Sequence, residues 1–155
     1  MIGHPAFPVE SWSVTETAFS PDVLGPAESV FALANGYLGL RGNLEEGDPV
    51  VLAGTYLNGF YESRPIIYGE YRHGFPRTSE TLLNVTDGKL IRLRVNGMWL
   101  DVRAGQLHSH RRTLELRSGV LTRELDWSSP GGGRVTVTSR RLVSLVDRHL
   151  AAVSY

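Results

Sequence analysis

The sequence predicts an all-β protein, built as an antiparallel β-sandwich. Short segments alternate between apolar and polar residues along most of the chain, and Asn-Gly or glycine-rich turns separate them. No amphipathic helix of ten or more residues is evident. Many short strands at regular spacing are typical of a sandwich, and 155 residues can bury a core without disulfides.

The strongest local prediction is a hairpin over residues 90–102. The segment 90–95 alternates, and its apolar face carries Ile91, Leu93 and Val95. Asn96-Gly97 follows, the dipeptide that best tolerates positive φ at both centres of a tight turn. The segment 98–102 then forms the returning strand.

A similar pattern of two apolar segments around an Asn-Gly turn occurs earlier, where residues 29–34 and 37–40 flank Asn35-Gly36. Helix propensity alone would allow a helix over residues 28–34. The Asn-Gly break and the apolar return segment favour a hairpin instead.

The second half of the chain predicts further strands. Residues 120–127 alternate and end at a loop over 128–133, after which 134–139 resume the period of two and 150–155 begin one more strand. Residues 65–79 are expected to form a long ordered loop. Since the chain stops inside a strand, we expect the sandwich to be incomplete at its C-terminus.

The charge is balanced overall but uneven along the chain. Residues 1–90 hold eleven acidic and five basic residues, and residues 91–155 hold five acidic and eleven basic residues. We expect the arginines to line the solvent face of the later strands; the alternative is a basic face that docks on a partner domain. The pattern does not fit nucleic-acid binding, because basic runs interleaved with aromatics do not occur.

Cellular location is inferred from what the sequence lacks. There is no cysteine, no signal peptide and no apolar run of membrane-spanning length. We therefore expect a cytoplasmic protein with no membrane partner.

Two groups of side chains are candidates for chemistry, and neither predicts a catalytic residue. Glu45, Glu46 and Asp48 cluster around Gly47 in a turn, where they are expected to be solvated loop charges. His108 and His110 alternate along a strand, but without a third ligand they predict a solvent-facing pair and no metal site.

One segment has a specific resemblance. Residues 28–47, which read ESVFALANGYLGLRGNLEEG, resemble the opening signature of glycoside hydrolase family 65, which includes the maltose, trehalose and kojibiose phosphorylases. Further blocks agree in order at residues 54–56, 90–93, 114–123, 139–144 and 149–152.

The resemblance implies a fold and a division of labour. It implies that residues 1–155 are part of an amino-terminal β-sandwich domain of the galactose-mutarotase-like kind. The family's helical linker and (α/α)6 barrel, which holds the general-acid glutamate and the phosphate site, have no matching positions here.

The implied function is that of a non-catalytic accessory domain that supports the barrel, with no cofactor of its own. The parent enzyme would act on α-glucosidic disaccharides, with inorganic phosphate as co-substrate if it is a phosphorylase. Its expected partners are the barrel, the disaccharide and a second copy in a homodimer.

Five residues of the signature are predicted to face the barrel. A simple hairpin explains Phe31, Leu33, Leu38 and Leu40 as core positions, but it does not require every polar or small residue between and after them. The predicted interface residues are Asn35, Gly36, Arg41, Gly42 and Asn43.

Two other functions remain open. A free-standing carbohydrate-binding module could stack sugars on Trp12, Trp99, Tyr61 and Tyr71, although core packing is the more common role of such aromatics. An aldose-epimerase-like enzyme would need a positioned histidine and glutamate, and the sequence offers no specific pair.

Overall fold

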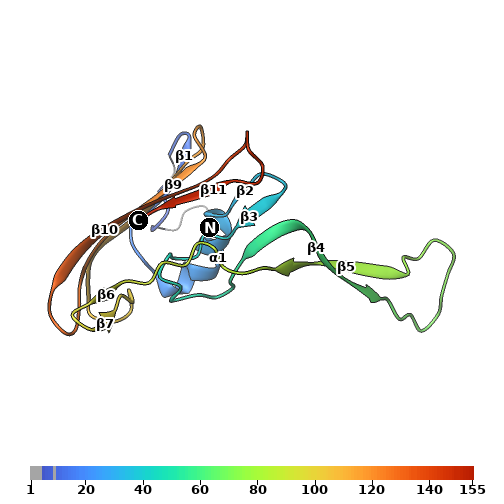
Figure 1. The fold of residues 1–155 in the computed structure, drawn as a ribbon, viewed down its shortest axis with the longest axis horizontal. Coiled ribbons are helices and arrows are strands. Elements are labelled where there is room, and N and C mark those ends of the chain that lie inside the picture. Colours follow the sequence, from blue (N-terminus) through green and yellow to red (C-terminus); the bar gives the residue numbers. More distant parts are fainter. Residues whose placement is uncertain (1–4, 9) are drawn as a thin grey trace.

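The computed structural model describes residues 5–8 and 10–155 and consists mostly of antiparallel strands (Figure 1). The predicted all-β class is confirmed. The larger sheet has five strands in the order β1-β8-β9-β10-β11. These strands are β1 Ser13–Glu16, β8 Gln106–Glu115, β9 Val120–Ser128, β10 Arg134–Val143 and β11 Ala151–Ser154.

A second sheet has four strands in the order β2-β3-β4-β5. Its strands are β2 Leu33–Ala34, β3 Leu38–Leu40, β4 Thr55–Pro65 and β5 Thr78–Asn84. A separate two-stranded ribbon joins β6 Arg94–Val95 to β7 Met98–Trp99.

The signature segment begins inside a helix, which the sequence interpretation had set aside in favour of a hairpin strand. A 3-10 turn, Pro21–Val23, leads into α1, Leu24–Val30, and only then does the β2–β3 hairpin form around Asn35-Gly36. The predicted turn is therefore confirmed, while a strand starting at residue 29 is wrong. The helix buries Ala27 and brings the fully buried Phe31 onto the large sheet.

The hairpin at Asn96-Gly97 is confirmed, with φ of 49° and 83° at the two residues. Its strands are shorter than predicted because the chain turns inward after Trp99. Leu100 and Val102 then enter the core.

The core lies on the inner face of the five-stranded sheet, in two clusters. One packs α1 and the β2–β3 hairpin on the sheet, and it contains Ala27, Phe31, Leu33, Leu40, Leu114, Leu121 and Val143. The other packs the segments around residues 44 and 100 on the sheet, and it contains Leu44, Leu100, Val102, Leu125, Trp127 and Val137. Phe31, Leu33 and Leu40 are core residues as predicted, and Leu38 is partly buried against them.

Strands β4 and β5 form a long hairpin that extends away from the rest of the molecule (Figure 1). The predicted loop between them is ordered by its own contacts, although its ends, Pro65 and Thr78, belong to the strands. Among the described residues, no helix has the length and apolar character needed to cross a membrane.

Candidate functional site

The five predicted interface residues lie at the two ends of the β2–β3 hairpin. Asn35 holds the turn together. Its Oδ1 accepts hydrogen bonds from the amides of Tyr37 (3.0 Å) and Leu38 (2.9 Å), and its Nδ2 donates to the carbonyls of Ser144 (2.6 Å) and Arg148 (3.0 Å). Gly36 follows with φ of 85° and open space around it.

At the other end of the hairpin, Arg41 and Asn43 hold the following loop. The Arg41 Nε and the Asn43 Nδ2 both donate to the carbonyl of Leu52, at 3.1 and 2.9 Å. Arg41 also lies 3.6 Å from the buried carboxylate of Glu28. Asn43 is buried, whereas part of the Arg41 side chain reaches solvent.

Gly42 lies between them in close contact with the helix end. A Cβ at this position would lie 2.6 Å from the Cβ of Phe31, so only glycine fits here without displacement. Its carbonyl accepts a hydrogen bond of 2.7 Å from the Arg112 guanidinium. All five residues thus have contacts within the chain, and their role at an interface stays a prediction.

Near the end of the signature, Glu45 and Glu46 point into the sandwich. Both are buried, which corrects the expectation of solvated loop charges. Glu45 accepts from Arg141 at 2.6 Å and lies 3.2 Å from Arg123, while Glu46 binds Arg123 at 2.8 Å. Only Asp48, at the end of the loop, remains half exposed.

Three buried arginines come from adjacent strands of the large sheet, and two of them, Arg123 and Arg141, bind these carboxylates. Arg112, Arg123 and Arg141 lie on the inner faces of β8, β9 and β10 and are almost fully buried. The expectation that the arginines line the solvent face is wrong for these three. Together with Glu16, which binds Arg112 at 2.6 Å, they form a buried network of three arginines and three glutamates.

Burial raises the pKa of Glu45, but the charges of Arg141 and Arg123 outweigh it and hold that pKa below its usual range. Glu45 is therefore ionised at neutral pH. Tyr155 donates a 2.8 Å hydrogen bond to Glu46, and burial together with this carboxylate raises the pKa of the Tyr155 phenol. The network is a set of fixed charges that joins the signature loop to the sheet.

His110 belongs to the same interior, which corrects the expectation of a solvent-facing histidine pair. Burial and the neighbouring Arg123 and Arg112 lower its pKa to about 2, so the ring is neutral. Its Nε2 accepts from Arg123 at 3.3 Å. A register shift between Leu107 and Ser109 separates it from the exposed His108.

Two further groupings of side chains concern metal binding and acid–base chemistry in the part of the chain that the structure describes. No group of three or more metal-ligating side chains comes together there. His110 lies 3.7 Å from Glu16, but both are buried, so this pair cannot reach a sugar as an epimerase's acid and base would.

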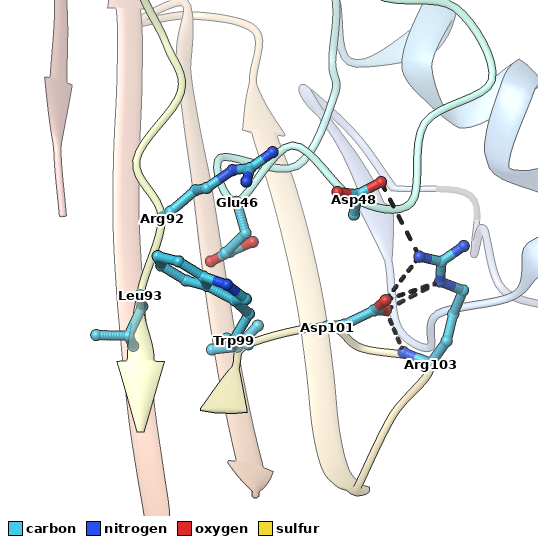
Figure 2. Close-up of a pocket in the computed structure, with 8 residues that line it drawn as sticks. Glu46, Asp48, Arg92, Leu93, Trp99, Asp101 and Arg103 are labelled. Atoms are coloured by element: carbon cyan, nitrogen blue, oxygen red, sulfur yellow. Dashed lines mark hydrogen bonds and ion pairs between the residues drawn. The ribbon is translucent and has the colours of Figure 1, made fainter. Parts of the chain in front are cut away.

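A surface pocket of about 260 Å³ opens beside the network, between the loop at Asp48 and the β6–β7 ribbon (Figure 2). Figure 2 shows Asp101 paired with Arg103 and Trp99 lying below Arg92. The Nη2 of Arg103 lies 2.6 Å from the Oδ2 of Asp101. The hydrogen bond from Arg103 lowers the pKa of Asp101. The pocket therefore presents the ring of Trp99 and several charged side chains. The Asp101 carboxylate is one of these charges, because its lowered pKa keeps it ionised at neutral pH.

The four aromatics considered for sugar stacking are all at the surface. Trp12, Tyr61, Tyr71 and Trp99 are between 46% and 59% exposed, so core packing is the wrong explanation for them. Arginine side chains lie over three of these rings, on Trp12, Trp99 and Tyr71.

The family profile described as glycosyl hydrolase family 65, N-terminal domain, matches residues 14–155. The chain belongs to this family. An uncharacterized glycosyl hydrolase of Mycobacterium tuberculosis is 54% identical over the whole chain, which covers 20% of that protein. The α,α-trehalose phosphorylase of Thermoanaerobacter brockii is 42% identical over 97% of this chain and 20% of its own length.

Among solved structures, a putative kojibiose phosphorylase from the human microbiome matches with a TM-score of 0.82 and 27% identity. The match covers 94% of this chain and 19% of that protein. The family 65 resemblance and the sandwich class predicted from the signature are both confirmed. The chain spans about a fifth of the length of the curated relatives it matches.

The sequence interpretation missed the buried network of this family 65 chain, although a signal for it was present. On β9 the buried face carries Leu121, Leu125 and Trp127. Arg123 occupies the same phase of the alternation, so the period of two already placed it inside.

Proposed function

We propose that this chain is a non-catalytic accessory domain of a family 65 phosphorylase or hydrolase that acts on α-glucosidic disaccharides of the maltose, trehalose or kojibiose type. The observation that carries the proposal is the family match over residues 14–155, together with the chain's share of about a fifth of relatives such as the trehalose phosphorylase. The domain would support an (α/α)6 barrel that follows a helical linker.

The chemistry of the acidic residues supports this role. Glycoside cleavage needs a carboxylic acid that keeps its proton until the leaving oxygen takes it. Glu45 and Asp101 have lowered pKa values, and each is bound to arginine. Such carboxylates hold structure together and are poor proton donors.

The proposed partners follow from the same role. The parent enzyme would bind the disaccharide, use inorganic phosphate as co-substrate if it is a phosphorylase, and form a homodimer in the cytoplasm. Gly36, with open space around it, and the solvent-accessible part of Arg41 would meet the barrel. Gly42 and Asn43 would act behind them by fixing the loop.

Two experiments test the proposal. The purified chain, incubated with maltose, trehalose and kojibiose with and without phosphate, should release neither glucose nor glucose phosphate; clear turnover would refute the accessory role. In addition, a chimera in which this chain replaces the matching segment of the Thermoanaerobacter brockii enzyme should retain trehalose phosphorolysis.

The chimera also tests the interface residues. Arg41→Ala is expected to lower kcat in it, because small displacements near a sugar site cost roughly a hundredfold in rate. The comparison is with Glu62→Gln, which lies in an exposed ion pair. A kcat of Arg41→Ala equal to that of the control, at unchanged melting temperature, would remove Arg41 from the interface.

A second candidate function is carbohydrate binding, which the exposed Trp99 beside the charged pocket favours. Sugars would stack on the ring while Asp48 and Arg103 bind hydroxyls. Titration calorimetry with maltose should then show binding that Trp99→Ala abolishes and Trp12→Ala preserves. Absence of heat at millimolar maltose would dismiss this candidate.

A further inference from the structure

Four buried polar side chains meet on the inner face of the large sheet, and they are called the polar quartet below. Glu16 of β1 and Arg123 of β9 lie directly opposite Arg112 of β8, one on either side of it. His110 precedes Arg112 by two residues on β8. Residues in either relation share one face of a sheet. The four side chains therefore lie together, and none is more than 3% exposed.

Hydrogen bonds join the members of the polar quartet in two pairs. The Arg112 Nε donates to the Glu16 Oε2 at 2.6 Å, and the Arg123 Nε donates to the His110 Nε2 at 3.3 Å. Between the two pairs, the His110 Nδ1 lies 3.7 Å from the Glu16 Oε2. This distance is too long for a direct hydrogen bond.

The bond from Arg123 determines which nitrogen of His110 carries a proton. A guanidinium can only donate hydrogen bonds, so the Nε2 that accepts from it has no proton. The lowered pKa of His110 keeps its imidazole neutral, and a neutral imidazole has one protonated nitrogen. The proton is therefore on Nδ1, the nitrogen nearest Glu16.

Three buried donors of the polar quartet have no hydrogen-bond partner among the residues that the structure describes. They are the Nη2 of Arg112, the Nη2 of Arg123 and the Nδ1 of His110. In a guanidinium the Nη2 and the Nε lie on the same edge. The two Nε atoms point at Glu16 and His110, so the Nη2 atoms lie along the edges that face the same two side chains.

Aromatic rings cover the polar quartet where other acceptors could have approached. The guanidinium carbon of Arg112 lies 4.6 Å from the centroid of the Phe31 ring. The ring of Phe19 packs edge-on against His110, with centroids 5.9 Å apart. Buried polar groups are almost always hydrogen-bonded. The three donors therefore require an acceptor that no side chain beside them supplies.

We propose that the polar quartet binds one internal water molecule, which accepts hydrogen bonds from the unpaired donors of Arg112, Arg123 and His110 and donates to the Glu16 carboxylate. A buried water typically makes about three hydrogen bonds to polar groups that are otherwise unsatisfied. The quartet offers three such donors and one carboxylate. The water closes the link between His110 and Glu16 and so joins β1, β8 and β9 through their side chains.

Charge selects water over an anion at this site. The positive charges of the buried network already equal its negative charges, with three arginines and three glutamates: Arg112, Arg123, Arg141, Glu16, Glu45 and Glu46. A chloride ion would satisfy the same donors, but it would place an uncompensated negative charge in the interior beside Glu16. A neutral water satisfies the donors without that cost.

This site goes beyond the proposed function and does not depend on it. It belongs to the interior of the sandwich and includes none of the five predicted interface residues. Loss of phosphorolysis in the chimera would leave the water site untouched, and loss of the water would leave the accessory role untouched.

The first test is NMR of the full 155-residue chain labelled with 15N at neutral pH. We expect His110 to have a protonated Nδ1 and a bare Nε2, with a slowly exchanging Nδ1–H that shows a nuclear Overhauser effect to a bound water. His108, which is exposed and lies beside Ser128, is the control and should show neither feature. A protonated Nε2 on His110, or an Nδ1–H without a contact to water, would overturn the proposal.

The second test is a crystal structure of the chain grown in bromide. We expect a water oxygen within about 3.2 Å of the Nη2 atoms of Arg112 and Arg123, without an anomalous signal. A bromide at this position, or no density there, would contradict a water site.

The third test counts long-lived waters by 17O magnetic relaxation dispersion. Glu16→Met combined with Arg112→Met removes both members of the ion pair, so no buried charge is left alone, and it should bind one long-lived water fewer per chain than the wild type. Asp126→Met with Arg134→Met, an exposed pair on the same sheet, is the matched control and should lose none. Equal counts in the two double variants would refute the assignment; if the first variant does not fold, the NMR and bromide results on the wild type decide.

Discussion

Glu45→Gln gives the most direct test of the buried network. The substitution keeps the shape of the side chain and a hydrogen-bond acceptor but removes the charge that lies 2.6 Å from Arg141 and 3.2 Å from Arg123. Three buried arginines would then face two carboxylates, those of Glu16 and Glu46. The interior would carry one uncompensated positive charge.

Removal of one partner from a buried ion pair typically costs about 3–5 kcal/mol. The free energy of unfolding of a domain is about 5–15 kcal/mol in total, so the variant should lose a large part of it. For a chain of this length the melting temperature should fall by roughly 10 °C.

Urea unfolding followed by the fluorescence of the buried Trp127 measures the loss. The control is Glu62→Gln, whose exposed pair with Arg64 should contribute less than about 0.5 kcal/mol. The difference between wild type and Glu45→Gln should also shrink with acid. The folded-state pKa of Glu45 lies below its ordinary 4.5, so its contribution is present above pH 4.5 and is lost as the pH falls through that lowered pKa.

Equal urea midpoints for Glu45→Gln and Glu62→Gln at pH 7 would refute the reasoning. The network would then contribute nothing to the free energy of unfolding, and burial of the six charges would need another explanation. A pH-independent difference between wild type and Glu45→Gln would contradict the assignment of the effect to ionised Glu45.

Three further predictions concern single sites. The pKa of His110 is about 2 in the folded chain and 6.5 when unconstrained, so the free energy of unfolding should fall as the pH drops below 6.5, by about 2 kcal/mol at pH 5. Urea titrations of His110→Gln should show a weaker dependence of this free energy on pH. An unchanged dependence would exclude His110 as its source. Gly42→Ala should cost about 1–3 kcal/mol in thermal unfolding because its Cβ meets Phe31, while Gly69→Ala, with open space around it, should be nearly neutral. Asn35→Ala removes four hydrogen bonds, so hydrogen exchange at the amides of residues 37 and 38 should accelerate at least tenfold; unchanged protection would show that the turn does not need the side chain.

Local patterns predicted what depends on neighbours in the chain. The Asn96-Gly97 turn and the strands around it follow from backbone preferences, which act over a few residues. The alternation along residues 120–127 predicted β9 because a period of two describes a strand wherever it lies. The family signature was also readable, since it is a property of residue order.

The interior polar network was not predicted, because burial depends on what covers a residue. Glu45 and Glu46 lie in a Gly/Pro-containing turn that looks solvated as a sequence. They are buried because the loop folds over the sheet at Arg123 and Arg141, 78 and 96 residues further along the chain from Glu45. No local pattern contains a contact of that separation.

The helix α1 and the β4–β5 hairpin differ from the sequence interpretation for related reasons. Propensity alone allowed a helix near residue 28, and the packing of Ala27 and Phe31 on the large sheet selected it. The sequence interpretation predicted neither β4 nor β5, and it gave no sign that this hairpin would extend away from the sandwich. The sequence by itself determined the all-β class, the two Asn-Gly turns and membership of family 65. Only the tertiary structure decided which charges are inside and which aromatics are outside, because it alone determines which surfaces lose contact with water.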